Sequence, residues 1–185
     1  MSNAARVLKL AGSRPPTLGN GRLICIDGPA GSGKTTLAAE IASLAGGAAV
    51  VHMDDLFEGW GGLGRVDEQL GTLLRPIAVG SSGSYRRWDW PGNAWAETVL
   101  VSPAPLLVLE GVGSGASAFA DLTTVLAWVE VPFELRMARG LERDGDSVAD
   151  VWRQWAEDEQ ALFARERTRE RADVVLDGRV GSRHG

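Results

Sequence analysis

A glycine-rich segment carries the clearest chemical signal in this sequence. Residues 28–35 are Gly-Pro-Ala-Gly-Ser-Gly-Lys-Thr, which fits the pattern G-x-x-x-x-G-K-[ST] at every fixed position. Glycines allow a main chain to wrap closely round a phosphate with its N–H groups pointing inward. A helix that begins at the same place adds a favourable dipole. The segment, which we call the phosphate loop, predicts a nucleotide site; the alternative is a glycine-rich turn that matches by chance.

The residue types of this loop suit a polyphosphate with its metal ion. The Lys34 ammonium can reach the β- and γ-phosphates, and the Thr35 hydroxyl can ligate Mg²⁺. Lys34 is one of two lysines beside 17 arginines, which hints that a compact charge on a flexible stem is needed there. We therefore expect ATP and Mg²⁺ as cofactors, with nucleotide contacts from Gly28, Ala30, Gly31, Ser32, Gly33, Lys34, Thr35 and Thr36.

Carboxylates follow three of the apolar runs of the chain. Ligands of open α/β sheets lie beyond the carboxyl ends of the strands, so these acids should gather near the phosphates. Asp54 is the candidate general base for a hydroxyl group, and Asp55 is an alternative base, an acceptor ligand or a helix cap. Glu110 is a candidate for holding Mg²⁺, unless it turns to solvent. For Asp27, a structural role at the loop is preferred.

Three arginines are spaced for one face of a helix. Arg136, Arg139 and Arg143 stand at i, i+3 and i+7 after a proline that can begin a helix. Arginines that close over a γ-phosphate would stabilise charge in the transition state, so Arg139 and Arg143 are candidate catalytic residues. The alternative is a solvated face paired with Glu142 and Asp144, and for Arg136 this alternative is favoured.

An aromatic stretch is the candidate site for a phosphate acceptor. Tyr85, Trp88 and Trp90 lie close together with Arg87 and Asp89. Aromatic rings suit a planar or sugar-like ligand, a carboxylate can accept bonds from hydroxyl groups, and an arginine can bind an anion. We predict acceptor contacts from Tyr85, Arg87, Trp88 and Asp89; the alternative is that the two tryptophans only pack against the sheet.

Alternating apolar runs and helical patterns would position these residues. The runs are continuously apolar, which is typical of strands covered on both faces, as in a parallel sheet flanked by helices. We therefore expect an α/β fold with a doubly wound parallel sheet. The predicted strands are 23–26, 49–53, 106–109, 125–131 and 174–176, and the clearest helices are 34–44, one after Pro132, and about 147–171.

The length and composition describe one domain. The chain has 185 residues, of which 44% are hydrophobic, enough for a sizeable core. We expect a poorly ordered lead-in over residues 1–20, a single domain over 21–180 and a loose tail over 181–185.

Charge and residue usage exclude several classes of partner. A net charge of −5 argues against nucleic-acid binding. A single cysteine, Cys25, cannot form an intramolecular disulfide. No apolar run approaches the length of a membrane span, and no hydrophobic leader is present at the N-terminus. The expectation is a cytoplasmic protein that binds neither membrane nor nucleic acid.

With these motifs the sequence resembles the P-loop nucleoside and small-metabolite kinases, especially the uridine kinase group. The resemblance implies a five-stranded parallel sheet with the loop strand at its centre, Asp54 as catalytic base and arginines that bracket the transferred phosphate. The stretch 84–91 departs from the acceptor-binding segments of that group. The resemblance is carried by Ile26-Asp27-Gly28, Thr35-Thr36-Leu37-Ala38, Met53-Asp54-Asp55-Leu56-Phe57, Leu109-Glu110-Gly111, Arg139 to Asp144, and Ala172 to Gly178.

The leading function is ATP-dependent phosphoryl transfer to a small alcohol, with a nucleoside as first choice of acceptor. Two alternatives stay open: a kinase of a sugar acid or vitamin precursor, and a non-catalytic protein that switches with ATP. The N-K-x-D motif of many GTPases is absent. The expected partners are a nucleoside triphosphate and a hydroxyl-bearing substrate. The choice between ATP and GTP as phosphate donor and the oligomeric state are left open.

Overall fold

A parallel β-sheet forms the centre of the structure, a computed structural model that describes residues 1–145 and 149–179. The strand order is β2-β5-β1-β6-β7. The predicted apolar runs therefore form one sheet, and the strand before the phosphate loop is central. The strands are β1 (Arg22–Asp27), β2 (Ala49–His52), β5 (Leu106–Glu110), β6 (Val125–Glu130) and β7 (Val174–Asp177).

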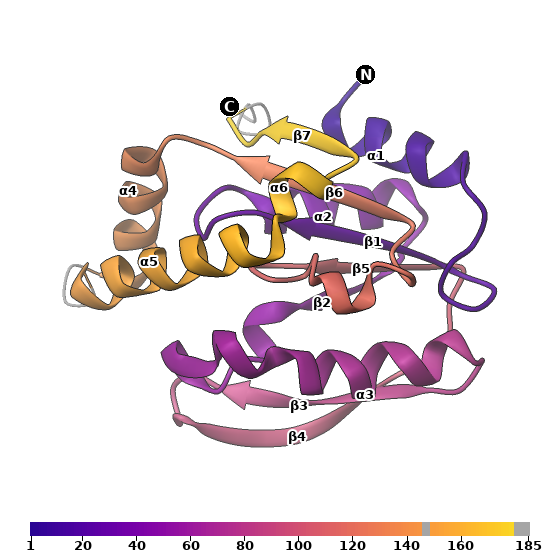
Figure 1. Ribbon diagram of the computed structural model, residues 1–185, viewed down its shortest axis with the longest axis horizontal. Helices are drawn as coiled ribbons and strands as arrows, with labels where there is room; N and C mark the ends of the chain where they lie inside the picture. Colours follow the sequence, from indigo (N-terminus) through magenta and orange to yellow (C-terminus); the bar gives the residue numbers. More distant parts are fainter. Residues whose placement is uncertain (146–148, 180–185) are drawn as a thin grey trace.

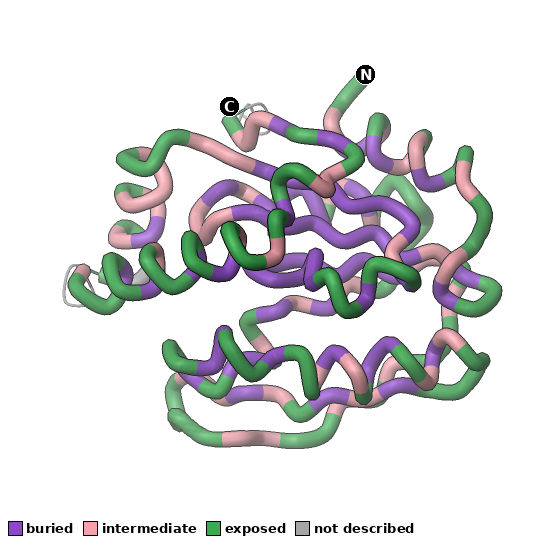
Figure 2. The backbone as a smooth tube through the Cα atoms, viewed as in Figure 1, coloured by how far each residue is buried: buried purple, intermediate pink, exposed green. Residues whose placement is uncertain are grey.

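Both faces of this sheet are buried. Along β1, Leu23 and Cys25 pack into one hydrophobic cluster, whereas Ile24 and Ile26 pack into a second cluster on the other side. Figure 2 shows the central strands as the most continuously buried part of the chain. This two-sided burial explains why the strands are apolar at every position rather than at alternate ones.

Helices cover the two faces. α1 (Asn3–Gly12) and α2 (Lys34–Leu44) bury Val7, Leu37 and Ile41 in one cluster. α3 (Val66–Ala78) and α5 (Ala149–Glu166) pack into the cluster on the opposite face. In Figure 1, α4 (Phe133–Asp144) and α5 lie beyond the carboxyl end of β6, on the side where α2 begins. Short 3-10 helices in the connections are η1 (Met53–Asp55), η2 (Gly59–Arg65) and η3 (Ser117–Phe119).

A hairpin forms a second, smaller sheet. β3 (Gly83–Asp89) and β4 (Ala94–Val101) are antiparallel, with a register shift between Arg86 and Trp88. Figure 1 shows the hairpin and α3 as one layer below the central sheet. These two strands were not among those predicted from the apolar runs of the sequence. The aromatic stretch therefore lies on β3, where the side chains of neighbouring residues point to opposite faces.

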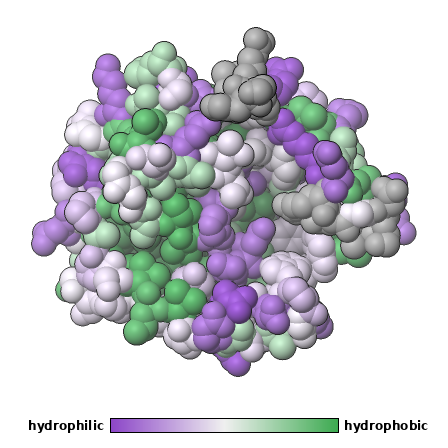
Figure 3. Space-filling view, turned by 180° about the vertical axis from the view of Figure 1, so that it is seen from behind, coloured by the Kyte–Doolittle hydropathy of each residue, from purple (hydrophilic) through white to green (hydrophobic). Residues whose placement is uncertain are grey.

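The surface of the molecule is mixed. Exposed apolar side chains include Leu44, Val79 and Leu100, and Figure 3 shows apolar areas beside a band of hydrophilic side chains on the rear face. Such mixing is usual for folded proteins. Among the described helices, none combines the length and the apolar character needed to cross a lipid bilayer.

The N-terminal segment corrects one expectation. Residues 1–20 are not a poorly ordered lead-in, because α1 occupies half of this range and packs on the sheet. Ala4, Val7 and Ala11 are buried, and Ser2 accepts a hydrogen bond from the Ala5 N–H at the helix start. The apolar face has the i, i+3, i+7 spacing of a helix, but two of its three members are alanines, so its pattern is faint in the sequence.

The long C-terminal helix is also shorter than predicted. α5 ends at Glu166, and a separate turn, α6 (Thr168–Arg171), follows. Arg167 between them has φ of 50°, a left-handed conformation that ends the hydrogen-bonding pattern of a helix. The start of the predicted helix at 147 and the predicted tail at 181–185 lie outside the described residues.

The packing of α1 can be tested by placing a charge on its buried face. Val7→Asp should lower the free energy of unfolding by about 3 kcal/mol or more, because an unpaired carboxylate would be buried. Urea denaturation measures this loss. Arg6→Asp adds the same group to the exposed face of the helix and should cost less than about 1 kcal/mol. Equal stabilities for the two variants would show that α1 is not packed on the sheet.

Candidate functional site

The phosphate loop joins β1 to α2 under tight local constraints. Gly28 has φ of 138°, and a Cβ atom there would lie 2.1 Å from the carbonyl oxygen of Val129, so only glycine fits. The preceding Asp27 is fully buried and accepts N–H bonds from Gly28 (2.7 Å), Gly113 (3.0 Å) and Gly115 (2.8 Å). Burial raises the pKa of Asp27 to about 6, although these bonds oppose the shift. Asp27 thus has the structural role that was preferred for it.

Lys34 lies inside the curve of the loop. Its Nζ donates to the carbonyl oxygens of Gly28 (2.7 Å) and Pro29 (2.8 Å), and the residue is 6% exposed. Burial lowers the pKa of the Lys34 ammonium. Four carboxylates oppose this shift and favour the charged form: Glu110, Asp27, Glu159 and Asp54.

The loop opens into a cavity of about 680 Å³. Six of the eight predicted nucleotide-binding residues line it: Ala30, Gly31, Gly33, Lys34, Thr35 and Thr36. Gly28 and Ser32 belong to the loop but do not line the cavity, and Ser32 is fully buried. Gly33 stands at the N-cap of α2 without a side-chain bond to the first turn. The first N–H groups of α2 are therefore available to an anion.

Thr35 and Glu110 meet at the edge of this cavity. The Thr35 hydroxyl lies 3.1 Å from Oε1 of Glu110, and His52 Nδ1 lies 2.5 Å from the same oxygen. The hydrogen bond that His52 makes to the Glu110 carboxylate raises the pKa of His52, against the effect of partial burial. Within the described ranges, no cluster of three or more His, Cys, Asp or Glu side chains could hold a metal alone. Two oxygen donors nevertheless fit Mg²⁺, which keeps waters and phosphate oxygens as its other ligands.

The two neighbouring aspartates face different surroundings. Asp54 is exposed and lines the cavity, close enough to Lys34 to favour its charge. Asp55 is half-buried, does not line the cavity and hydrogen-bonds with Tyr85. Burial raises the pKa of Asp55. The structure therefore places Asp54, not Asp55, beside the phosphate loop.

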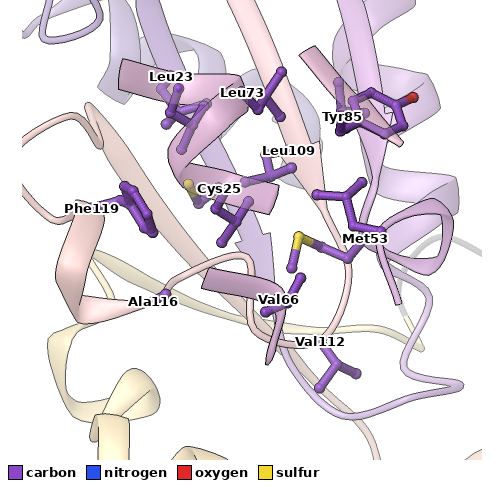
Figure 4. Packing of buried hydrophobic residues seen from close by; sticks show 14 of the residues in the cluster. Leu23, Cys25, Met53, Val66, Leu73, Tyr85, Leu109, Val112, Ala116 and Phe119 are labelled. Carbon is purple, nitrogen blue, oxygen red and sulfur yellow. The ribbon is translucent and has the colours of Figure 1, made fainter. Parts of the chain in front are cut away.

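The predicted acceptor residues on β3 do not line the cavity. Tyr85 belongs to the hydrophobic core beside Met53, and Figure 4 shows its ring among the buried side chains. Burial raises the pKa of Tyr85 to about 12. Trp88 is 7% exposed and packs edge-to-face on Trp95, with 5.0 Å between ring centroids. Trp88 thus packs within the hairpin and does not line the cavity.

The charged residues of β3 are also directed elsewhere. Arg87 forms a two-bond ion pair with Glu97 of β4, at 2.8 and 3.1 Å. The Asp89 carboxylate lies against Gly92 in the turn of the hairpin. Neither Arg87 nor Asp89 lines the cavity. Sequence proximity to Trp90 suggested a shared site, but the alternation and bulge of the strand decide the direction of each side chain.

Five aromatic side chains line the cavity instead, and we call them the aromatic wall. Trp60 contacts Trp90, Trp155 and Trp152 edge-to-face, with centroid distances of 5.4, 5.7 and 6.5 Å. The Trp90 indole N–H donates to the main-chain oxygen of Asp54 at 3.0 Å, which ties the wall to the candidate base. The wall consists of Phe57, Trp60, Trp90, Trp152 and Trp155.

The three arginines of α4 have different positions. Arg139 lines the cavity and donates to the carbonyl oxygen of Gly31 at 3.2 Å. The side chain of Arg143 lies outside the described part of the chain. Arg136 is no solvated residue: its side chain is 12% exposed and pairs with Glu159 at 2.6 Å. Gly140 allows α4 and α5 to meet, since a Cβ atom there would lie 2.4 Å from the Trp152 ring.

Two residues that bond to groups of the site were not predicted from the sequence. His52 precedes the Asp54 segment at the end of β2, where a polar residue after an apolar run was a usable signal. Glu159 lies between Trp155 and Leu162 on the buried face of α5. An acid within an apolar stripe was a signal as well, because buried carboxylates need a partner.

Comparisons with known proteins give a fold. No protein-family model matches the chain, and no curated protein matches it. A possible uridine kinase from Bacillus stearothermophilus has a TM-score of 0.67 and 22% identity, over 96% of this chain and all of that chain (100%). A candidate fructose transport system kinase from Silicibacter sp. TM1040 has a TM-score of 0.63 and 21% identity, over 95% and 99% of the two chains. The chain thus has the fold of these two proteins, a five-stranded parallel sheet flanked by helices, as its resemblance to the uridine kinase group predicted.

Proposed function

We propose that this protein is an ATP-dependent kinase that phosphorylates a hydroxyl group of a small metabolite, with a nucleoside as the leading acceptor class. One observation carries the proposal. A single cavity is lined by the phosphate loop, by Asp54 and Glu110 at neighbouring strand ends, and by an aromatic wall. A phosphate site, a base and an apolar surface for a second ligand are what phosphoryl transfer to an alcohol requires.

The roles of the residues follow from their positions. The loop amides and Lys34 bind the β- and γ-phosphates, and Arg139 neutralises charge on the transferred group. Thr35 and Glu110 would hold Mg²⁺, which when bound supplies charge neutralisation on the phosphate oxygens. Asp54 accepts the proton of the attacking hydroxyl. The tryptophans of the wall exclude water from the reacting groups.

The aromatic wall supports an acceptor with a flat body. Planar rings stack on indoles or pack edge-to-face against them, and a nucleoside joins such a ring to a primary hydroxyl group.

The experiment that tests the proposed function is a screen of ADP formation with magnesium over nucleosides, sugars, sugar acids and vitamin alcohols. Acceleration by a nucleoside supports the leading class, and acceleration by another compound replaces it. If the protein binds nucleotide but no alcohol accelerates ADP formation, that result would contradict kinase activity.

The charge of Lys34 can be tested by truncation. Lys34→Ala should lower kcat by about a hundredfold or more and weaken ATP binding, because a buried cation at the phosphates is lost. Steady-state kinetics and calorimetry with ATP and magnesium measure the two effects. Lys9→Ala removes the other lysine, on the exposed side of α1, and should change neither. Wild-type turnover by Lys34→Ala would remove this side chain from the mechanism.

The assignment of the base can be tested by neutralising each aspartate. Asp54→Asn should lower kcat by about 10²- to 10⁴-fold while the affinity for ATP stays within a factor of about three, since only proton transfer is lost. Asp55→Asn should lower kcat less, because Asp55 does not line the cavity. A larger loss of kcat in the Asp55 variant would transfer the role of base to that residue.

The aromatic wall can be tested through the Michaelis constant of the acceptor found in the screen. Trp60→Ala should raise this constant about tenfold and leave the constant for ATP unchanged, because one face of the acceptor site is removed. Trp95→Ala is the matched control, since Trp95 packs on the hairpin and does not line the cavity. Identical acceptor constants in the two variants would exclude the wall from acceptor binding.

A further inference from the structure

A carboxylate is buried on α5 next to the phosphate loop. Glu159 is 2% exposed and shares one face of the helix with Trp152, Trp155 and Leu162. A buried carboxylate is costly unless charged or polar groups surround it. The partners of Glu159 therefore indicate its role.

Both oxygens of this carboxylate have defined partners. Oε2 accepts the main-chain N–H of Ala30 at 2.8 Å, and Oε1 accepts an N–H of Arg136 at 2.6 Å. The same Arg136 nitrogen donates to the carbonyl oxygen of Ala30 at 3.1 Å. The ion pair between α4 and α5 thus bonds to both polar main-chain groups of Ala30. Glu159 accepts its N–H, and Arg136 donates to its carbonyl oxygen.

Stability alone does not account for this arrangement. Burying an ion pair is costly, and a well-packed apolar pair of similar volume is often as stable or more so. What an apolar pair does not supply is an acceptor for the Ala30 N–H and a donor for its carbonyl oxygen. The negative charge of Glu159 also favours the protonated form of the nearby Lys34.

We propose that Glu159, acting with Arg136, is a positioning residue of the phosphate loop. It fixes the Ala30 main chain so that the following loop N–H groups face the cavity. It also ties α5, with Trp152 and Trp155 of the aromatic wall, to the nucleotide site. The inference rests on the proposed function, because the loop is the part of the protein proposed to bind ATP.

The test separates loop geometry from stability with two variants. In Glu159→Gln, the amide offers one acceptor where the carboxylate offers two, so the bond to Ala30 or that to Arg136 is lost. In the double variant Arg136→Met/Glu159→Leu, an apolar pair replaces the ion pair. Calorimetric titration with ATP and magnesium gives the dissociation constant, and thermal denaturation gives the melting temperature.

We expect Glu159→Gln to weaken ATP binding about tenfold, the effect of one charged hydrogen bond. The double variant should melt near the wild-type temperature but also bind ATP about tenfold more weakly. Recovery of both stability and ATP affinity in the double variant would reduce the pair to a structural role. If the double variant does not fold, wild-type ATP affinity in Glu159→Gln overturns the proposal by itself.

A matched control lies on the same helix. Asp150 and Arg153 form an exposed ion pair on α5, and Arg153→Met/Asp150→Leu should leave ATP affinity unchanged. A tenfold loss in this control would mean that any change on α5 disturbs the loop, and would overturn the specific role of Glu159. Failure of the proposed function has a different signature: either the wild-type protein itself does not bind ATP, or it binds ATP and no alcohol accelerates ADP formation. Neither result depends on a substitution at Glu159.

Discussion

The turn between β1 and α2 leaves a row of main-chain N–H groups without partners in the helix, and several buried groups hold that turn in one shape. Asp27 accepts N–H bonds beneath it, Lys34 bonds back to two of its carbonyl oxygens, and the pair of Arg136 and Glu159 holds Ala30. Donors aimed in advance at a phosphate bind it well, because no conformational freedom is lost on binding. Both α4 and α5 thus contribute side chains that bond to the phosphate loop.

Electrostatics at the cavity differ from those of the whole chain. The protein carries a net charge of −5, yet its loop presents N–H groups, a helix N-terminus and a buried ammonium. Burial lowers the pKa of that ammonium, and the carboxylates around Lys34 oppose this shift by favouring the charged form. A site that combines carboxylates with hydrogen-bond donors for phosphate suits a polyphosphate that carries a divalent cation. The cation offsets the repulsion between the carboxylates and the phosphates.

The aromatic wall of the cavity is assembled from three distant parts of the sequence. Phe57 and Trp60 follow β2, Trp90 comes from the turn of the hairpin, and Trp152 and Trp155 come from α5. Their edge-to-face contacts make one surface next to the candidate base. The helix α5, which supplies two of these rings, also bonds to the phosphate loop through Glu159. The aromatic wall and the phosphate loop are therefore joined through one helix.

The sequence by itself determined the features that depend on neighbours along the chain. The phosphate loop, the helix over 34–44 and the five apolar strands follow from local spacing and from burial on both faces of the sheet. Only the tertiary structure decided which polar groups meet. Arg136 pairs with Glu159 and bonds to the phosphate loop because α4 and α5 bring the two side chains together beside the loop. Arg87 turns to β4 rather than to the cavity because of the pleat of its strand. Such pairings join residues far apart in sequence, and side-chain direction there is set by packing that no local pattern records.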